Sequence, residues 1–213
     1  MIGLKAEAFM KRINGNVYVL QSSANIDRVE QIQKACKNVN RTLVIDIFTA
    51  HILSNIPDDS FSDIRIFYPF WLTQKMHETT EGTKKMIRFS KRKISKEELK
   101  TRRDLCILVR ENMLIDIKNR MDHGDSGLIY SKWEGYKKGI KTERFLDFFK
   151  SHNLETISLH TSGHADIQTI KDFVKDLYPK TIIPVHTQTP EKYKEIFGGL
   201  VCLLDDKIKY EVL

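Results

Sequence analysis

The sequence predicts an α/β fold built on a parallel sheet. Short stretches that are almost continuously apolar recur along the chain, and helical patterns separate most of them. Strands of parallel sheets have this appearance, because the helices of the crossover connections cover both faces of the sheet. The 213 residues, of which 41% are hydrophobic, are enough to bury a core in one domain or slightly more.

The expected elements follow one another in a regular order. A buried strand at 15–20 (GNVYVL) leads through the polar turn QSSAN into a helix from about Asp27 to Asn38. Asp27 and Glu30 give this helix a start that resembles a capping box. A short helix is expected before Pro57, and the tail at 199–213 reads as a hairpin that turns at Asp205–Lys207. The other expected strands are TLVIDIF (42–48), DIRIFYP (63–69), LCILV (105–109), GLIYS (127–131), TISLH (156–160) and TIIPVH (181–186).

The composition indicates the kind of binding partner and the cellular compartment. Thirty-five Lys and Arg against 28 Asp and Glu give a net charge of +7, which favours a polyanionic partner. No apolar run has membrane-spanning length and no signal-peptide pattern is present, so we expect a cytoplasmic protein. Cys36, Cys106 and Cys202 stand apart in apolar stretches, which predicts buried thiols rather than a zinc site or disulfides.

A dense run of Lys and Arg at 84–103 interrupts the alternation of strands and helices. Two interpretations are open for it. The run can be a solvated helix face and loop, or it can flank a nucleic-acid channel with Phe89 available for base stacking.

Polar residues at strand ends indicate anion binding. Ser22 and Ser23 lie in the turn between a strand and a helix N-terminus, where free amides and the helix dipole attract phosphate. An ordinary capped turn is the alternative. Ser131 ends the strand at 127–131 in the same manner, with Lys132 beside it.

The segment HTSGHAD (160–166) is the stronger signal. Gly163 permits close backbone approach, Thr161 and Ser162 offer hydroxyls, and His160 and His164 can donate a hydrogen bond or a proton near neutral pH. A helix is expected to begin near Asp166. His186 ends the next expected strand, at the same sheet edge as His160, and open α/β sheets place their ligands at that edge.

Residues 160–187 resemble the C-terminal signature of metallo-β-lactamase-fold nucleases with a β-CASP domain, a family that includes ribonuclease J and the pre-mRNA 3′-end cleavage endonuclease. Residues 17–45 are similar to the start of the β-CASP insert, and LIYSKWEGY (128–136) is similar to its last strand and turn. The resemblance implies a β-CASP-like parallel-sheet domain at 1–150 and the C-terminal part of a metallo-β-lactamase-like domain at 151–213.

The resemblance also implies roles for single residues. It makes His164 the catalytic proton donor or transition-state contact, and His186 the last histidine ligand of a zinc pair. The residues that would hold substrate phosphates are Ser22, Ser23, Ser131, His160, Thr161, Ser162 and Gly163. The implied partner is single-stranded RNA, and DNA stays open.

One departure from the family matters. The metal motif His-x-His-x-Asp-His does not occur in the chain. A single histidine cannot hold zinc tightly, so we expect zinc in the complete family enzyme and none stably bound by this chain alone. The expected partners are therefore a metallo-β-lactamase N-terminal half or a second copy, either of which would cover an exposed edge or apolar face.

Two alternatives to a nuclease part remain. The first is a catalytically inert module, or regulatory subunit, that binds RNA or phosphate. The second is a mononucleotide-binding Rossmann-like protein, against which the lack of a Gly-x-Gly-x-x-Gly or Walker-type lysine loop counts.

Overall fold

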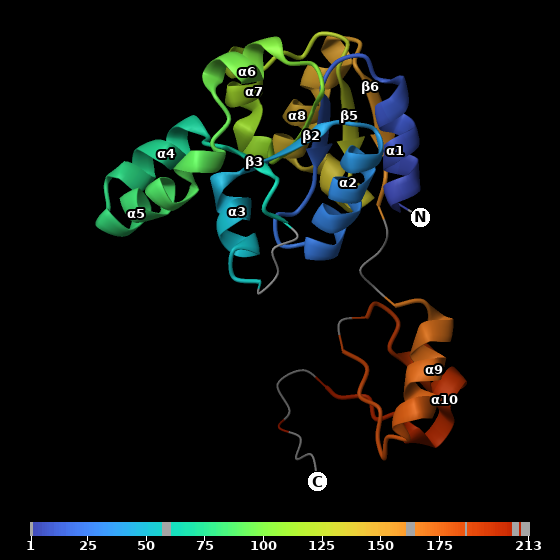
Figure 1. Ribbon diagram of the computed structural model, residues 1–213. Helices are drawn as coiled ribbons and strands as arrows, with labels where there is room; N and C mark the ends of the chain where they lie inside the picture. Colours follow the sequence, from blue (N-terminus) through green and yellow to red (C-terminus); the bar gives the residue numbers. More distant parts are fainter. Residues whose placement is uncertain (1, 57–60, 161–164, 186, 206–208, 210–213) are drawn as a thin grey trace. The chain divides into compact units, whose positions relative to one another are not determined.

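The computed structural model describes residues 2–56, 61–160, 165–185, 187–205 and 209. The chain divides into two compact units, Met1–Thr161 and Ser162–Leu213, which can be followed in Figure 1. The expected domains were 1–150 and 151–213. The last strand of the larger unit lies after residue 150, at Glu155–Ser158.

A six-stranded parallel sheet forms the centre of the larger unit. Its strand order is β3-β2-β4-β1-β5-β6, and every neighbouring pair is parallel. The predicted α/β fold with a parallel sheet is therefore confirmed. The strands are β1 (Val17–Leu20), β2 (Thr42–Asp46), β3 (Arg65–Phe67), β4 (Leu105–Val109), β5 (Gly127–Tyr130) and β6 (Glu155–Ser158).

Helices cover both faces of this sheet, as Figure 1 shows. Val17 and Val19 of β1 pack with residues of α1, α2, α3 and α5 on one face. Tyr18 and Leu20 point the other way, because side chains alternate along a strand, and they pack with residues of α6, α7 and α8. The helices of the larger unit are α1 (Ile2–Arg12), α2 (Ile26–Asn38), α3 (Ile47–Leu53), α4 (Phe70–His77), α5 (Thr80–Phe89), α6 (Lys96–Thr101), α7 (Leu114–Arg120) and α8 (Ile140–Ser151), with the 3₁₀ turns η2 (Ser90–Arg92), η3 (Glu111–Met113) and η4 (Glu134–Lys138).

The burial of the strands explains the sequence pattern that predicted them. Every residue of β1, β4 and β5 is buried. Each buried Val, Leu or Ile contributes about 1.5–3 kcal/mol of apolar burial, so these central strands anchor the core. β6 is an edge strand that pairs with β5, and most of its residues are exposed.

Two boundaries differ from the expectation. The strand expected at 42–48 ends at Asp46, because the Asp46 carboxylate accepts a hydrogen bond from the Thr49 amide (3.0 Å) and starts α3 at Ile47. Helix α2 begins at Ile26, since the side chain of Asn25 caps it by accepting from the Arg28 amide. The expected capping role of Asp27 was wrong.

The thiols follow the prediction in the larger unit. Cys36 and Cys106 are free and buried, whereas Cys202 in the smaller unit is half-buried. None of the helices in the described ranges is both long enough and apolar enough to cross a membrane.

The smaller unit contains α9 (Ile167–Leu177), α10 (Glu191–Phe197) and the 3₁₀ turn η5 (Gly198–Leu200). Helix α9 begins next to Asp166, as expected, and the Asp166 side chain caps it by accepting from the Thr169 amide (2.9 Å). The strand expected at 181–186 was wrong: within the described residues Ile182 makes one parallel bridge to Val201, and Pro184 offers no amide proton for a ladder. Most of the expected turn at Asp205–Lys207 lies outside the described residues.

Candidate functional site

At the carboxyl edge of the sheet, neighbouring strands continue into helices on opposite faces. β1 and β4 are neighbours, yet β1 continues into α2 on one face while β4 continues into α7 on the other. A crevice at such a switch point is the usual ligand site of open α/β sheets. Four of the predicted site residues follow strands at this edge: Ser22, Ser23, Ser131 and His160.

The side chain of Arg28 in α2 links the ends of β5 and β6 by hydrogen bonds. Its guanidinium is 4% exposed, and Nη1 donates to the Ser131 hydroxyl and to the Leu159 carbonyl (3.2 Å). Ser131 in turn donates to the same carbonyl at 2.5 Å. Burial lowers the pKa of Arg28, but a guanidinium still keeps its charge at every physiological pH. A fixed positive charge therefore lies under the strand ends from which the HTSGHAD segment departs.

His160 is the next residue along this edge, and its side chain is exposed. Desolvation and the nearby charge of Arg28 lower the pKa of His160, and Glu134 opposes them. The imidazole is therefore neutral at neutral pH. A bound phosphate would reverse this balance, because a negative charge favours the imidazolium.

Ser22 and Ser23 differ in their surroundings. Ser22 is exposed, and its Oγ lies 3.4 Å from the Ala24 amide, so its hydroxyl is accessible to a ligand. Ser23 is buried, with its Oγ 2.9 Å from Thr49 Oγ1. Thr49 also donates to Asp46, which is paired with Arg110 beyond β4. Ser23 thus belongs to a buried polar cluster that joins the ends of β1, β2 and β4.

Gln21 also lies in this cluster. It lines a narrow crevice at the switch point together with Ser23, Asp46, Thr49 and Arg110. The residue is 3% exposed, and neither the amide nitrogen nor the carbonyl oxygen of its side chain is bonded within the part of the chain that the structure describes. Buried polar groups are almost always paired, so this amide lowers the stability of the fold as it stands.

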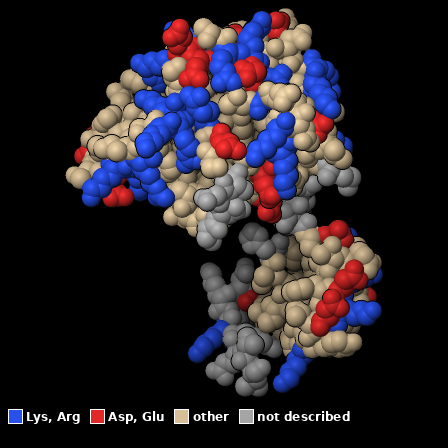
Figure 2. All heavy atoms as spheres, viewed as in Figure 1, with Lys and Arg blue, Asp and Glu red and all other residues tan. Residues whose placement is uncertain are grey.

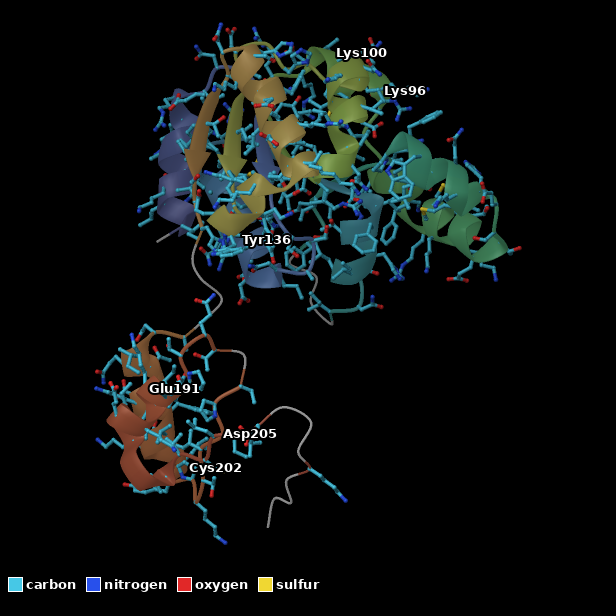
Figure 3. All side chains as sticks on the ribbon, turned by 180° about the vertical axis from the view of Figure 1, so that it is seen from behind. Lys96, Lys100, Tyr136, Glu191, Cys202 and Asp205 are labelled. Carbon is cyan, nitrogen blue, oxygen red and sulfur yellow. The ribbon has the colours of Figure 1, made fainter. Side chains whose placement is uncertain are left out.

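Two exposed aromatic rings follow β5 at the same edge. Trp133 is 58% and Tyr136 is 55% exposed, and the rings meet edge to face with centroids 5.4 Å apart. Figure 3 shows Tyr136 at one end of the larger unit and Lys96 and Lys100 at the opposite end.

The last part of the basic run at 84–103 lies away from this edge. Its last helix, α6, lies at the opposite end of the sheet, where the Arg102 guanidinium donates to the hydroxyl of Thr42 at the start of β2. The expectation that Phe89 is available for stacking was wrong, because its side chain is 2% exposed and packs in the core. Figure 2 shows Lys and Arg side chains spread over much of the visible face of the larger unit.

The predicted metal ligand and acid lie outside the described residues. They are His186 and His164, and with them Thr161, Ser162 and Gly163. Among the residues that are described, no three His, Cys, Asp or Glu side chains come together in a group that could hold a metal ion. The described side chains therefore do not fit a zinc pair.

Several residues of this edge were not found from the sequence. Gln21 lies in the predicted turn QSSAN, Arg28 in the predicted helix, and Trp133 and Tyr136 in the segment LIYSKWEGY, but no role was predicted for any of them. The available signal was their position, because each follows or faces the carboxyl end of a predicted strand.

Comparison with known proteins adds one finding. No curated protein matches this chain. Residues 152–194, about a fifth of the chain, match the family model RMMBL, which describes a Zn-dependent metallo-hydrolase RNA specificity domain. The match begins just before β6 and includes His160 and α9. This part of the chain is therefore similar to the RNA specificity domain of zinc-dependent metallo-hydrolases.

Proposed function

We propose that this chain is the RNA-binding part of a metal-dependent RNA-processing nuclease of the β-CASP type, similar to ribonuclease J. The observation that carries the proposal is the position of the matched segment. It contains the edge strand β6 and His160, which lies at the carboxyl edge of the sheet near the buried Arg28. The exposed imidazole of His160 can contact a phosphodiester, and the buried guanidinium of Arg28 places a fixed positive charge beside it.

In this proposal Ser22, Ser23, Ser131, His160, Thr161, Ser162 and Gly163 contact the phosphates of single-stranded RNA, or of DNA as a second possibility. His164 is the proton donor at the scissile phosphate, and His186 is a ligand to zinc. In this proposal the other ligands come from a metallo-β-lactamase half. The complex acts in the cytoplasm.

The test uses a fluorescently labelled single-stranded RNA and the purified chain. We expect salt-dependent binding without cleavage. Addition of a metallo-β-lactamase half that carries His-x-His-x-Asp-His should restore cleavage. His164→Ala should then abolish cleavage at unchanged metal content, whereas His186→Ala should lower the zinc content measured by elemental analysis. Failure to bind any single-stranded nucleic acid would refute the proposal.

The second candidate is a catalytically inert module that binds RNA. It rests on the description of the matched family model as an RNA specificity domain. It predicts RNA binding that is equally strong with and without the metallo-β-lactamase half, and no cleavage in either case.

A further inference from the structure

We infer that Trp133 and Tyr136 form a stacking site for an unpaired base of single-stranded RNA. The inference rests on the proposed function and deepens it, because it names a base contact beside the phosphate contacts. We call the two rings and the turn η4 that holds them the aromatic turn.

The turn fixes the position of the Trp133 backbone. The Trp133 carbonyl accepts hydrogen bonds from the Tyr130 hydroxyl (2.9 Å) and from the Tyr136 amide (3.0 Å). Tyr130 is itself fully buried in the core, so the exposed tryptophan is attached to the rigid part of the sheet.

Gly135 makes room for the ring. A Cβ atom at this position would lie 2.1 Å from Cζ3 and 2.2 Å from Cη2 of Trp133, so the indole lies against the Gly135 backbone and a larger residue would displace it. The two rings meet edge to face, and Trp133 and Tyr136 are each more than half exposed, which leaves ring surface accessible to a ligand.

Paired and exposed lysines lie beside the rings. Lys132 Nζ is paired with Glu111 (2.6 Å), and Lys137 Nζ is paired with Glu134 (2.8 Å). Lys138 of the same turn is exposed and offers a positive charge to a nucleic-acid backbone. Single strands bind where bases stack on aromatic rings beside such charges.

The aromatic turn also adjoins the phosphate contacts. Glu134 of η4 is close enough to His160 to influence its pKa, and Lys137 reaches Ser158, two residues before His160. A strand whose phosphate lies at His160 therefore has a neighbouring base within reach of Trp133.

The experiment uses the fluorescence of Trp133 in the full chain. The sequence has two tryptophans, Trp71 and Trp133, so Trp71→Phe leaves Trp133 as the single tryptophan, which is excited selectively over tyrosine. The probes are an oligoadenylate and an abasic oligomer of the same length, which carries the same phosphates without bases. We expect oligoadenylate to quench the Trp133 emission and the abasic oligomer to leave it unchanged.

Affinity gives the second readout. Trp133→Ala should weaken oligoadenylate binding at least about fivefold and leave the affinity for the abasic oligomer unchanged. Gly135→Ala should act in the same direction although it deletes no aromatic atom, because the new methyl displaces the indole. Trp71→Phe is the matched control and should bind like the wild type. Circular dichroism of each variant checks that the fold is intact.

The outcomes separate this inference from the proposed function. Unchanged oligoadenylate affinity in Trp133→Ala overturns the stacking site and leaves RNA binding standing. Equal losses on both probes also overturn it, because Trp133 would then act only through the phosphate contacts. A variant that loses self-association in sedimentation while keeping RNA affinity assigns the rings to a protein contact instead. The lack of binding to either probe in the wild type refutes both proposals.

Discussion

Arg28 and Ser131 are 103 residues apart in the sequence and form a buried hydrogen bond at the carboxyl edge of the sheet. The bond joins α2, which follows β1, to the end of β5, and the Leu159 carbonyl beyond β6 accepts from both side chains. Three elements that lead to the candidate site are thereby held in one arrangement.

Ser131→Ala should lower the free energy of unfolding by about 1–3 kcal/mol, because the buried Arg28 guanidinium loses one of its acceptors. Ser22→Ala is the matched control. Ser22 is exposed at the same edge, and its replacement should change stability by less than about 0.5 kcal/mol. Urea denaturation measures both values. Equal stabilities of the two variants would show that the Arg28–Ser131 bond does not support the fold.

Gln21→Leu should stabilise the chain and weaken RNA binding. A buried amide without a partner costs about 1–3 kcal/mol, so an apolar side chain of similar size should raise the free energy of unfolding by about 1 kcal/mol. If the Gln21 amide forms a hydrogen bond to bound RNA, the same change lowers the affinity for RNA. Urea denaturation and fluorescence anisotropy test the two effects. A variant that is more stable and binds RNA normally would remove Gln21 from the site.

The sheet could be predicted because a strand that is buried on both faces consists almost entirely of apolar residues. Where local chemistry competes with that pattern, the prediction fails. Ile47 and Phe48 continue the apolar run of β2, yet the carboxylate of Asp46 turns the chain into a helix there. Likewise TIIPVH reads as a strand, but within the described residues it has one bridge and Val185 is 76% exposed.

The site was predictable only in part, for a related reason. Ser22, Ser131 and His160 could be placed because they follow strands. The burial of Arg28 could not be foreseen, because it depends on the pairing of β5 with β6, and a charged residue in the first turn of a helix normally faces water.

The salt dependence of RNA binding should show which lysines contact the phosphates of the RNA. Replacing Lys137 and Lys138 of η4 with Ala removes two charges near the carboxyl edge, and the slope of log K against log salt should fall by about 1.4 for a single strand. Lys96 and Lys100 of α6 are the matched control at the opposite end of the sheet (Figure 3), and their double replacement should leave the slope unchanged. If only the replacement of Lys96 and Lys100 lowers the slope, the RNA binds along the basic run at 84–103 instead.

RNA affinity should rise as the pH falls, through protonation of His160. In the free chain the pKa of His160 lies below its ordinary value of 6.5, because of desolvation and the charge of Arg28. A phosphate beside the ring stabilises the imidazolium and raises that pKa in the complex, so binding takes up a proton. The gain in affinity therefore begins as the pH falls through the pKa of the complex and levels off below the lowered pKa of the free chain.

His160→Gln keeps a hydrogen-bonding side chain that does not titrate, and its affinity should be nearly constant over the same range. Anisotropy titrations from about pH 5 to 8 measure both proteins, and the range covers the titration of histidine. NMR titration of the His160 ring protons gives the pKa directly with and without RNA. If the pKa of His160 is the same in both states, the imidazole does not contact a phosphate, and the anion contacts at this edge belong to other groups, such as the exposed hydroxyl of Ser22.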